Sequence, residues 1–248
     1  MNARTAPALL AAPIFASLIL ACLPGLSRAE DSFTVVGNNA PPYRIIDGSD
    51  FYGIYFDAMA EAARRAGFAL HPVEAPFKRC LAMMEHGQAD IMLGPNKTPE
   101  REAYMVYTNA TLPAADKAFY IYPGDPPVTR YEDLAGLRVA VVAGRAHFPR
   151  FDADASLRKT ECPDAIAALE KVLTGDCDVA VLPELEGDWA LLRYNLPLAK
   201  SRFTVPGQAS YITIAKGSPA LARRRSIEQA MAEMVQDGTM AAIVERYR

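Results

Sequence analysis

The sequence predicts an α/β fold built from two strand–helix units in tandem. Two observations support this prediction. Strand-like and helix-like segments alternate through the first third of the chain, and a second alternating set begins at Arg138. Such alternation favours a mostly parallel sheet covered by helices. No low-complexity linker or repeat of fixed period interrupts the pattern, and 248 residues suffice for one large domain or two small ones.

The first unit alternates short apolar runs with segments of helical spacing. A helix is expected over 54–66, where apolar side chains recur every three or four residues, and Gly67 follows as a stop signal. Bounded apolar or β-rich runs of this length are typical of strands. The other elements expected here are strands over 33–36, 68–73 and 91–93 and a helix over 80–85.

The second unit repeats this alternation after an extended run over 117–122. Its clearest helix, over 164–173, keeps its apolar residues on one face and ends before Gly175. Gly238 is expected to end a later helix, and Thr239 to cap a short final one. The remaining expected elements are strands over 138–142, near Leu157, over 178–182 and over 211–214, and helices near Phe148, over 184–194 and over 219–236.

The stretch from 90 to 101 is the strongest candidate for a binding site. A buried strand over 91–93 ends in a Gly-Pro turn, and Thr98 and Pro99 then have the features of a helix N-cap and first helical residue. Backbone N–H groups at a helix start favour an anion, and Arg101 adds a planar fork that matches a carboxylate. The alternative is an ordinary capped turn whose arginine pairs with a surface acid.

The sequence offers no argument for catalysis, a cofactor, a metal or nucleic acid. The histidines His71, His86 and His147 are far apart, and none adjoins a recognisable nucleophile motif. No Cys or His pair has zinc-ligand spacing, and no glycine-rich phosphate loop occurs. A net charge of −3 without a basic run gives no reason to expect a phosphate-backbone track.

Residues 1–29 are predicted to be a secretory signal peptide. The segment has a positively charged start at Arg4, an apolar middle over 8–23 and a small-x-small exit that ends at Ala29. We therefore expect cleavage after Ala29 and a periplasmic location. A lipoprotein signal at Cys22 is the alternative, and the bulky Leu20 disfavours it.

Removal of this segment leaves Cys80, Cys162 and Cys177 in an oxidising compartment. Three is an odd number, so at least one thiol stays free unless it pairs between chains. Cys162 and Cys177 flank the helix expected over 164–173, which spans roughly 15 Å and exceeds the reach of a disulfide. Pairing of these two is therefore disfavoured.

An ordered set of motifs resembles the type 2 periplasmic solute-binding proteins, in the family that contains the polar amino-acid receptors of ABC importers. The positions that match this family include Gly94, Asn96, Thr98 and Arg101. Further matches lie upstream over 41–43 and 53–57, and downstream, in order, over 133–141, 175–181 and 214–219. The resemblance covers essentially the whole mature chain.

This resemblance implies a monomeric, two-lobed type II binding fold in which each lobe is a mostly parallel sheet covered by helices. The chain would cross between the lobes twice, near 111–116 and near 205–210. Lobe 1 would then comprise residues 30–112 and 210–248, and lobe 2 residues 113–209. Two lobes on short hinges can close over a ligand held between them.

The resemblance also implies roles for individual residues. Arg101 would bind a ligand carboxylate with help from Thr98, while Gly94 and Asn96 would offer backbone or amide groups. The remaining expected ligand contacts are Tyr43 and Phe77 as aromatic walls, which have core packing as their alternative, and Asn38 in the loop after the first strand.

The second half departs from the family pattern at several positions. Arg145 stands where a small hydroxyl residue is usual, and it suits either a second acid group of the ligand or a solvated loop. Leu182 and Pro183 replace the usual ammonium-binding carboxylate, and Glu184 follows one residue later as a candidate for that role or as a solvent-facing helix residue. In the first half, Arg79 is less typical of this family, and it is either a second anion contact or a structural partner of a nearby acid.

The predicted function is a periplasmic receptor that captures a small carboxylate-bearing solute, an amino acid or related compound, for an ABC permease. One alternative is a periplasmic enzyme of the same fold that dehydrates a small carboxylic acid, with Glu184 as its only evident general acid. The other is a binding protein that passes its signal to a membrane sensor.

Overall fold

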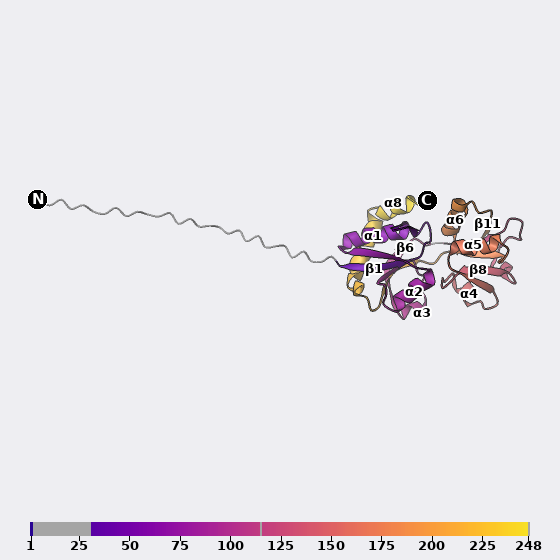
Figure 1. Cartoon of the computed structure of the whole chain (residues 1–248), viewed down its shortest axis with the longest axis horizontal. Coiled ribbons are helices and arrows are strands. Elements are labelled where there is room, and N and C mark those ends of the chain that lie inside the picture. The colour runs from indigo at the N-terminus through magenta and orange to yellow at the C-terminus, as the bar shows by residue number, and fades with distance from the viewer. Residues whose placement is uncertain (2–30, 115, 248) are drawn as a thin grey trace.

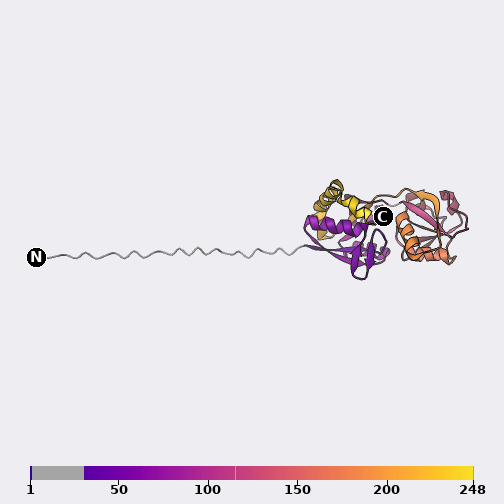
Figure 2. The same ribbon diagram turned by 90° about the horizontal axis from the view of Figure 1, so that it is seen from above.

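A computed structural model describes residue 1, residues 31–114 and residues 116–247. It consists of two lobes, each built on a five-stranded sheet and lying side by side (Figure 1 and Figure 2). The strand orders are β4-β1-β5-β12-β6 and β11-β7-β10-β8-β9. The signal peptide predicted over 1–29, its cleavage site and Cys22 lie outside the described residues.

The first sheet is mixed. Its parallel part comprises β1 (Ser32–Gly37), β4 (Ala69–Glu74) and β5 (Ile91–Leu93). β12 (Ser210–Ala215) pairs antiparallel with both β5 and β6 (Met105–Leu112). β6 leads out of this sheet and β12 returns to it, so the antiparallel strands are those next to the crossings between the lobes.

The second sheet has the same arrangement. β8 (Arg138–Val142) pairs in parallel with β9 (Arg158–Cys162) and β10 (Val179–Pro183). The entering strand β7 (Lys117–Ile121) pairs antiparallel with β10 and with β11 (Ala199–Val205). The expectation of mostly parallel sheets therefore holds for the strand–helix–strand parts and fails at the entering and leaving strands.

Helices cover both faces of the first sheet. α1 (Ile54–Ala66), α7 (Arg224–Gln236) and α8 (Thr239–Glu245) pack on one face, and α2 (Phe77–Glu85) packs on the other. The period of two along β1 explains this division, because Val35 and Val36 point into different cores. The α2 core is continuous with a core of the second sheet.

The second sheet is covered in a similar way. α5 (Ala165–Leu173) and α6 (Glu184–Tyr194) pack on the face that continues the α2 core. Phe148 and Phe151, at the start of and within the short α4 (Pro149–Ala153), pack on the opposite face. Both lobes therefore have the layered α/β construction that their alternating segments predict.

Several predicted elements need correction. The helix expected over 219–236 is a 3₁₀ turn over Pro219–Arg223 followed by α7, with Ser218 as the N-cap of the turn. Gly238, not Thr239, occupies the N-cap position of α8. α2 begins at Phe77, three residues before its expected start at Cys80. The strands that the sequence did not predict are β6, β11 and the hairpin of β2 (Ile45–Asp47) and β3 (Asp50–Tyr52).

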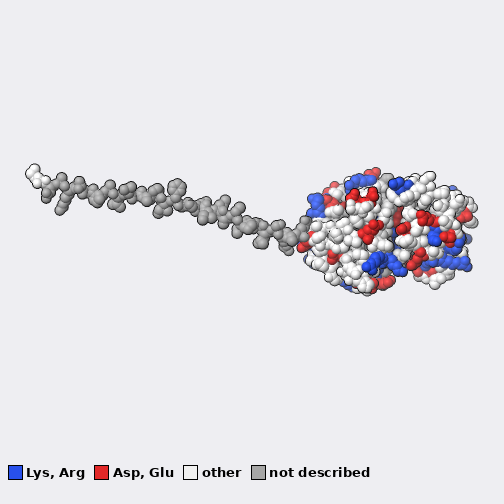
Figure 3. Space-filling view, in the orientation of Figure 1, with Lys and Arg blue, Asp and Glu red and all other residues white. Residues whose placement is uncertain are grey.

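The three cysteines of the described chain, Cys80, Cys162 and Cys177, are free and buried. Within the same residues, no helix is long and apolar enough to cross a membrane. Acidic and basic side chains are interspersed on the face that Figure 3 shows.

Candidate functional site

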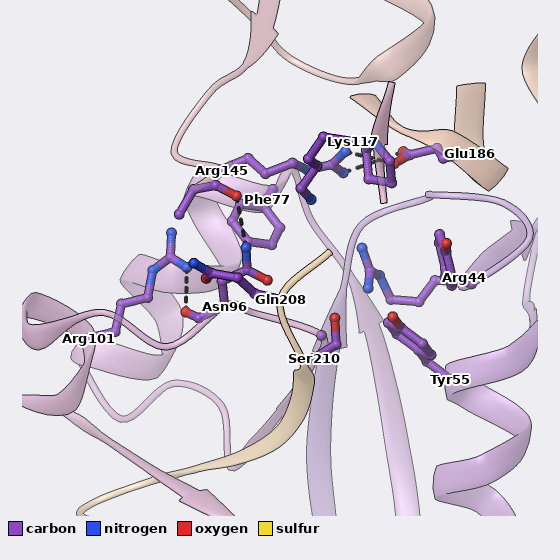
Figure 4. Close-up of a pocket in the computed structure, with 14 residues that line it drawn as sticks. Arg44, Tyr55, Phe77, Asn96, Arg101, Lys117, Arg145, Glu186, Gln208 and Ser210 are labelled. Atoms are coloured by element: carbon purple, nitrogen blue, oxygen red, sulfur yellow. Dashed lines mark hydrogen bonds and ion pairs between the residues drawn. The ribbon is translucent and has the colours of Figure 1, made fainter. Parts of the chain in front are cut away.

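A small cavity of about 40 Å³ lies between the lobes, and side chains from both lobes line it, including residues on or beside the two crossings (Figure 4). Its lining is rich in cationic and aromatic side chains. The residues are Tyr43, Arg44, Tyr55, Phe77, Gly94, Asn96, Arg101, Lys117, Arg145, Ala146, Pro183, Glu186, Gln208 and Ser210.

Arg101 connects the two lobes at this cavity. It lies in the short helix α3 (Pro99–Glu102), whose N-cap Thr98 accepts a hydrogen bond from the Arg101 backbone N–H at 3.3 Å. The buried guanidinium donates from Nη1 to the Asn96 carbonyl at 2.8 Å and from Nη2 to the Gly144 carbonyl at 2.7 Å. Asn96 adds a second bridge, from its side-chain amide to the Ala146 carbonyl at 3.1 Å. The lobes are therefore in direct contact beside the cavity.

Arg44 is held rigidly on the first-lobe side. It donates from Nε and Nη2 to the carbonyl and side-chain oxygens of Asn38 at 3.2 and 2.9 Å, and from Nη1 to the Leu93 carbonyl at 3.0 Å. Burial, followed by repulsion from Arg145, lowers the pKa of Arg44. Gly94 makes room for this arrangement, because a Cβ there would lie 2.7 Å from both Arg44 Nη1 and the Tyr55 ring.

Arg145 forms a buried ion pair with Glu186. Its Nη1 lies 2.7 Å from Glu186 Oε2, and its Nη2 lies 3.4 Å from Oε1. The two side chains are only 7% and 2% exposed. The guanidinium carbons of Arg101 and Arg145 each lie 5.7 Å from the centroid of the Phe77 ring. Phe77 thus packs against cations from both lobes.

Lys117 is the first residue of β7 and follows the first crossing directly. The residue is 5% exposed, yet its side-chain ammonium forms no hydrogen bond or ion pair within the described part of the chain. Burial, followed by repulsion from Arg145, lowers the pKa of Lys117 to about 8, although attraction to Glu186 opposes the shift. Figure 4 shows its side chain directed into the space that Arg44 and Ser210 also face.

The structure brings most of the predicted ligand contacts together. Tyr43, Phe77, Gly94, Asn96, Arg101 and Arg145 all line the cavity. Two other predicted contacts, Asn38 and Thr98, do not line the cavity but support residues that do. Asn38 accepts a hydrogen bond from Arg44, and Thr98 is the N-cap of the helix that carries Arg101. The backbone N–H of Gly94, which was expected to be available to the ligand, instead donates to the Tyr211 carbonyl.

Of the two roles expected for Glu184, the structure agrees with the solvent-facing helix residue and not with the ammonium-binding one. The Glu184 carboxylate accepts from Lys200 at 2.7 Å, outside the cavity, and Asp188 one turn later contacts the same ammonium. Glu186 is about 200° further around α6 and faces the cavity instead. Gly187 fixes this rotation, because a Cβ there would lie 2.2 Å from the Tyr120 ring. Arg79 also lies away from the cavity, near Gln88.

The sequence reasoning missed several lining residues. Arg44 directly follows the predicted Tyr43, and Tyr55 lies in a motif that was singled out, so both were within reach. Lys117, Gln208 and Ser210 lie on or beside the crossings. A rule that hinge residues line the cleft would have found these three.

The charge of the lining favours non-covalent binding of an anion. Four cationic side chains line the cavity, and Glu186 is the single carboxylate among the described lining residues. The structure shows no group of three or more His, Cys, Asp or Glu side chains placed to hold a metal within the residues that it describes.

Two lobes that meet over a cationic cavity, joined by two chain crossings, define a two-lobed solute-binding protein. The chain belongs to the bacterial extracellular solute-binding proteins, family 3, whose sequence profile matches residues 34–248. Proteins of this family bind solutes and are not enzymes, which removes the dehydratase alternative. No curated protein sequence matches the chain.

Solved structures share this type II fold at low sequence identity. An ancestral arginine-binding protein bound to arginine aligns with a TM-score of 0.77 at 21% identity, covering 89% of this chain and 99% of that one. The arginine-, lysine-, histidine-binding protein ArtJ from Geobacillus stearothermophilus aligns with a TM-score of 0.74 at 16% identity, covering 87% and 94%. A histidine kinase sensor domain with similarity to periplasmic binding proteins aligns with a TM-score of 0.75 at 20% identity, covering 88% and 96%.

Proposed function

We propose that this protein is a monomeric periplasmic receptor that closes its lobes over a small carboxylate-bearing solute and delivers it to an ABC permease. Residues 1–29 would be removed on export. Residues 30–112 and 210–248 would form one lobe, and residues 113–209 the other.

The position of Arg101 carries this proposal. Its buried guanidinium faces the cavity and uses neutral carbonyl groups from both lobes as its hydrogen-bond partners. Two of its five N–H donors are used in this way, and the others are available to a ligand carboxylate. A carboxylate at this point would contact the lobe-bridging residue and favour the closed state.

The comparisons support the solute class and the transport context. The similar structures include binding proteins for arginine and other amino acids and the substrate-binding protein of an amino-acid ABC transporter. An amino acid or a related acid is therefore the first class of ligand to test.

Signalling is the second candidate function. The histidine kinase sensor domain aligns about as well as the transport proteins do. A receptor that serves a sensor uses the same closed state, so co-purification with a permease or with a membrane kinase distinguishes the two functions.

The experiment is a thermal-shift screen of the purified protein against amino acids, monocarboxylates and dicarboxylates. A bound carboxylate raises the melting temperature by mass action. Arg101→Ala should strongly reduce the shift, whereas Arg79→Ala, a matched change at an exposed arginine outside the cavity, should retain it. The absence of a shift with every carboxylate would overturn the proposed function.

A further inference from the structure

The charges that line the cavity are unequally compensated. Arg145 is neutralised by Glu186, and both oxygens of that carboxylate face the guanidinium at 2.7 and 3.4 Å. Arg44 and Arg101 donate only to neutral carbonyl and amide oxygens. The Lys117 ammonium has no hydrogen-bond or ion-pair partner within the described residues. Three cationic charges therefore remain without a carboxylate.

Besides Glu186, the acidic groups that attract Lys117 are Asp152 and Asp116, and both are hydrogen-bonded elsewhere. Asp116 accepts from the Gly207 backbone N–H at 2.9 Å and so connects the two crossings. Asp152 accepts from the His147 backbone N–H with both oxygens at 3.1 Å. A buried cation without a counter-charge is costly, and a ligand anion would compensate it.

An ammonium group would find no free carboxylate among the described lining residues. Glu186 is the single carboxylate among the described lining residues, and it could accept an ammonium only by giving up part of its pairing with Arg145. The loss of one partner of a buried ion pair is strongly destabilising. The cavity volume of about 40 Å³ also favours a short solute.

We propose that the solute is a short dianion without an ammonium group, a dicarboxylate in class, with one acid group at Arg101 and the other at Lys117. Arg44 supplies a fixed positive field behind the second acid group, and Gln208 and Ser210 add neutral polar groups from the return crossing (Figure 4). This assignment depends on the proposed role of Arg101 as a carboxylate anchor.

The test is calorimetric titration of the full protein with matched solutes. Succinate carries two carboxylates, L-aspartate adds an ammonium to the same skeleton, and butyrate lacks one carboxylate. Malonate and glutarate vary the length, and sulfate reports on a compact inorganic dianion. The tightest-binding dicarboxylate should bind at least about tenfold more tightly than aspartate and butyrate, which corresponds to about 1.4 kcal/mol.

The outcomes separate this inference from the proposed function. Tighter binding of aspartate, equal binding of butyrate, or binding of sulfate alone would overturn the dicarboxylate assignment. The first two of these outcomes would leave a carboxylate receptor in place. No binding of any carboxylate or amino acid would overturn both proposals.

Variants test the role of Lys117 directly. Lys117→Met should weaken the best dicarboxylate at least about thirtyfold and butyrate much less. Lys200→Met is the matched control, since Lys200 pairs with Glu184 and Asp188 outside the cavity, and its dicarboxylate affinity should be unchanged. Lys117→Gln provides a second neutral variant if the methionine variant misfolds. Unchanged dicarboxylate affinity in a folded Lys117 variant would overturn the assignment.

Discussion

The two walls of the cavity hold their cations in different ways. On the first-lobe wall, Arg44 and Arg101 are fixed by neutral oxygens of the backbone and of one amide. On the second-lobe wall, Arg145 is fixed by a carboxylate, and Lys117 has no partner among the described residues. The first wall therefore presents charge on a rigid frame, and the second presents one neutralised and one uncompensated cation.

This difference separates structural from binding charges. A cation paired with a buried carboxylate contributes to the contact between α6 and the turn after β8, and adds little net field to the cavity. A cation that donates only to neutral oxygens, or that has no partner, remains uncompensated and can attract an anionic ligand. Removal of the paired group should therefore affect folding, whereas removal of the others should affect binding.

The largest expected effect is on folding, from Glu186→Gln. This change leaves the Arg145 guanidinium buried without a counter-charge, so the free energy of unfolding should fall by about 3–5 kcal/mol. Glu184→Gln is the matched control on the same helix. Glu184 pairs with Lys200 at the surface, so that change should cost within about 1 kcal/mol. Urea denaturation measures both, and equal losses would contradict the comparison.

The next effect is on binding, from Arg101→Ala. Truncation of one member of a desolvated charge pair costs about 2–5 kcal/mol, so carboxylate affinity should fall by at least about thirtyfold. Arg101→Lys should recover only part of this loss, because an ammonium lacks the bidentate fork. Stability should also fall slightly, since the guanidinium donates to the Asn96 and Gly144 carbonyls. Calorimetric titration measures the affinity, and thermal melting checks that the variant is folded. Unchanged affinity in a folded variant would show that Arg101 is not the anchor.

Local patterns were sufficient to predict most of the fold. The observed bounds of α1, β5, β8 and α6 agree with the ranges predicted from the sequence, because each segment has its own pattern of apolar residues and a clear start or stop signal. β6 was missed, and the antiparallel direction of β12 was not foreseen. Their placement depends on pairing between segments about a hundred residues apart, which a local pattern does not encode.

The site was only partly predictable for a similar reason. Arg101 and Tyr43 lie in recognisable motifs, and the structure places both at the cavity. Lys117 resembles any lysine at the start of a strand until the other lobe buries it. The choice between Glu184 and Glu186 depends on the rotation of α6, which packing of Gly187 against Tyr120 determines.

A smaller effect is expected from pH, through Lys117. Its pKa of about 8 results first from burial and then from Arg145; Glu186, Asp152 and Asp116 oppose the shift. Dicarboxylate affinity should be steady below about pH 8 and fall by up to about tenfold per pH unit above it, as the ammonium loses its proton.

The stability of the ligand-free protein should change in the opposite direction over the same range. The folded-state pKa of Lys117 lies below the ordinary value of 10.5, so the unfolded chain binds more protons between about pH 8 and that value. The free energy of unfolding therefore receives a contribution that rises with pH across this interval. Ligand titration measures the affinity and urea denaturation measures the free energy of unfolding, each from pH 6.5 to 9.5 on the parent protein and on Lys117→Met. A parallel pH dependence in the variant would assign the effect to another group.

The smallest expected effect concerns closure, from Asn96→Ala. The Asn96 amide donates across the cleft to the Ala146 carbonyl at 3.1 Å, whereas the bond from Arg101 uses the Asn96 backbone oxygen and survives the substitution. The variant should therefore lose one neutral hydrogen bond of the closed state, about 1 kcal/mol, or about fivefold in affinity. Because the bond forms only when the lobes meet, the loss should appear as faster dissociation with an unchanged association rate. Stopped-flow kinetics separates the two rates, and a slower association with unchanged dissociation would show that Asn96 acts in the open state.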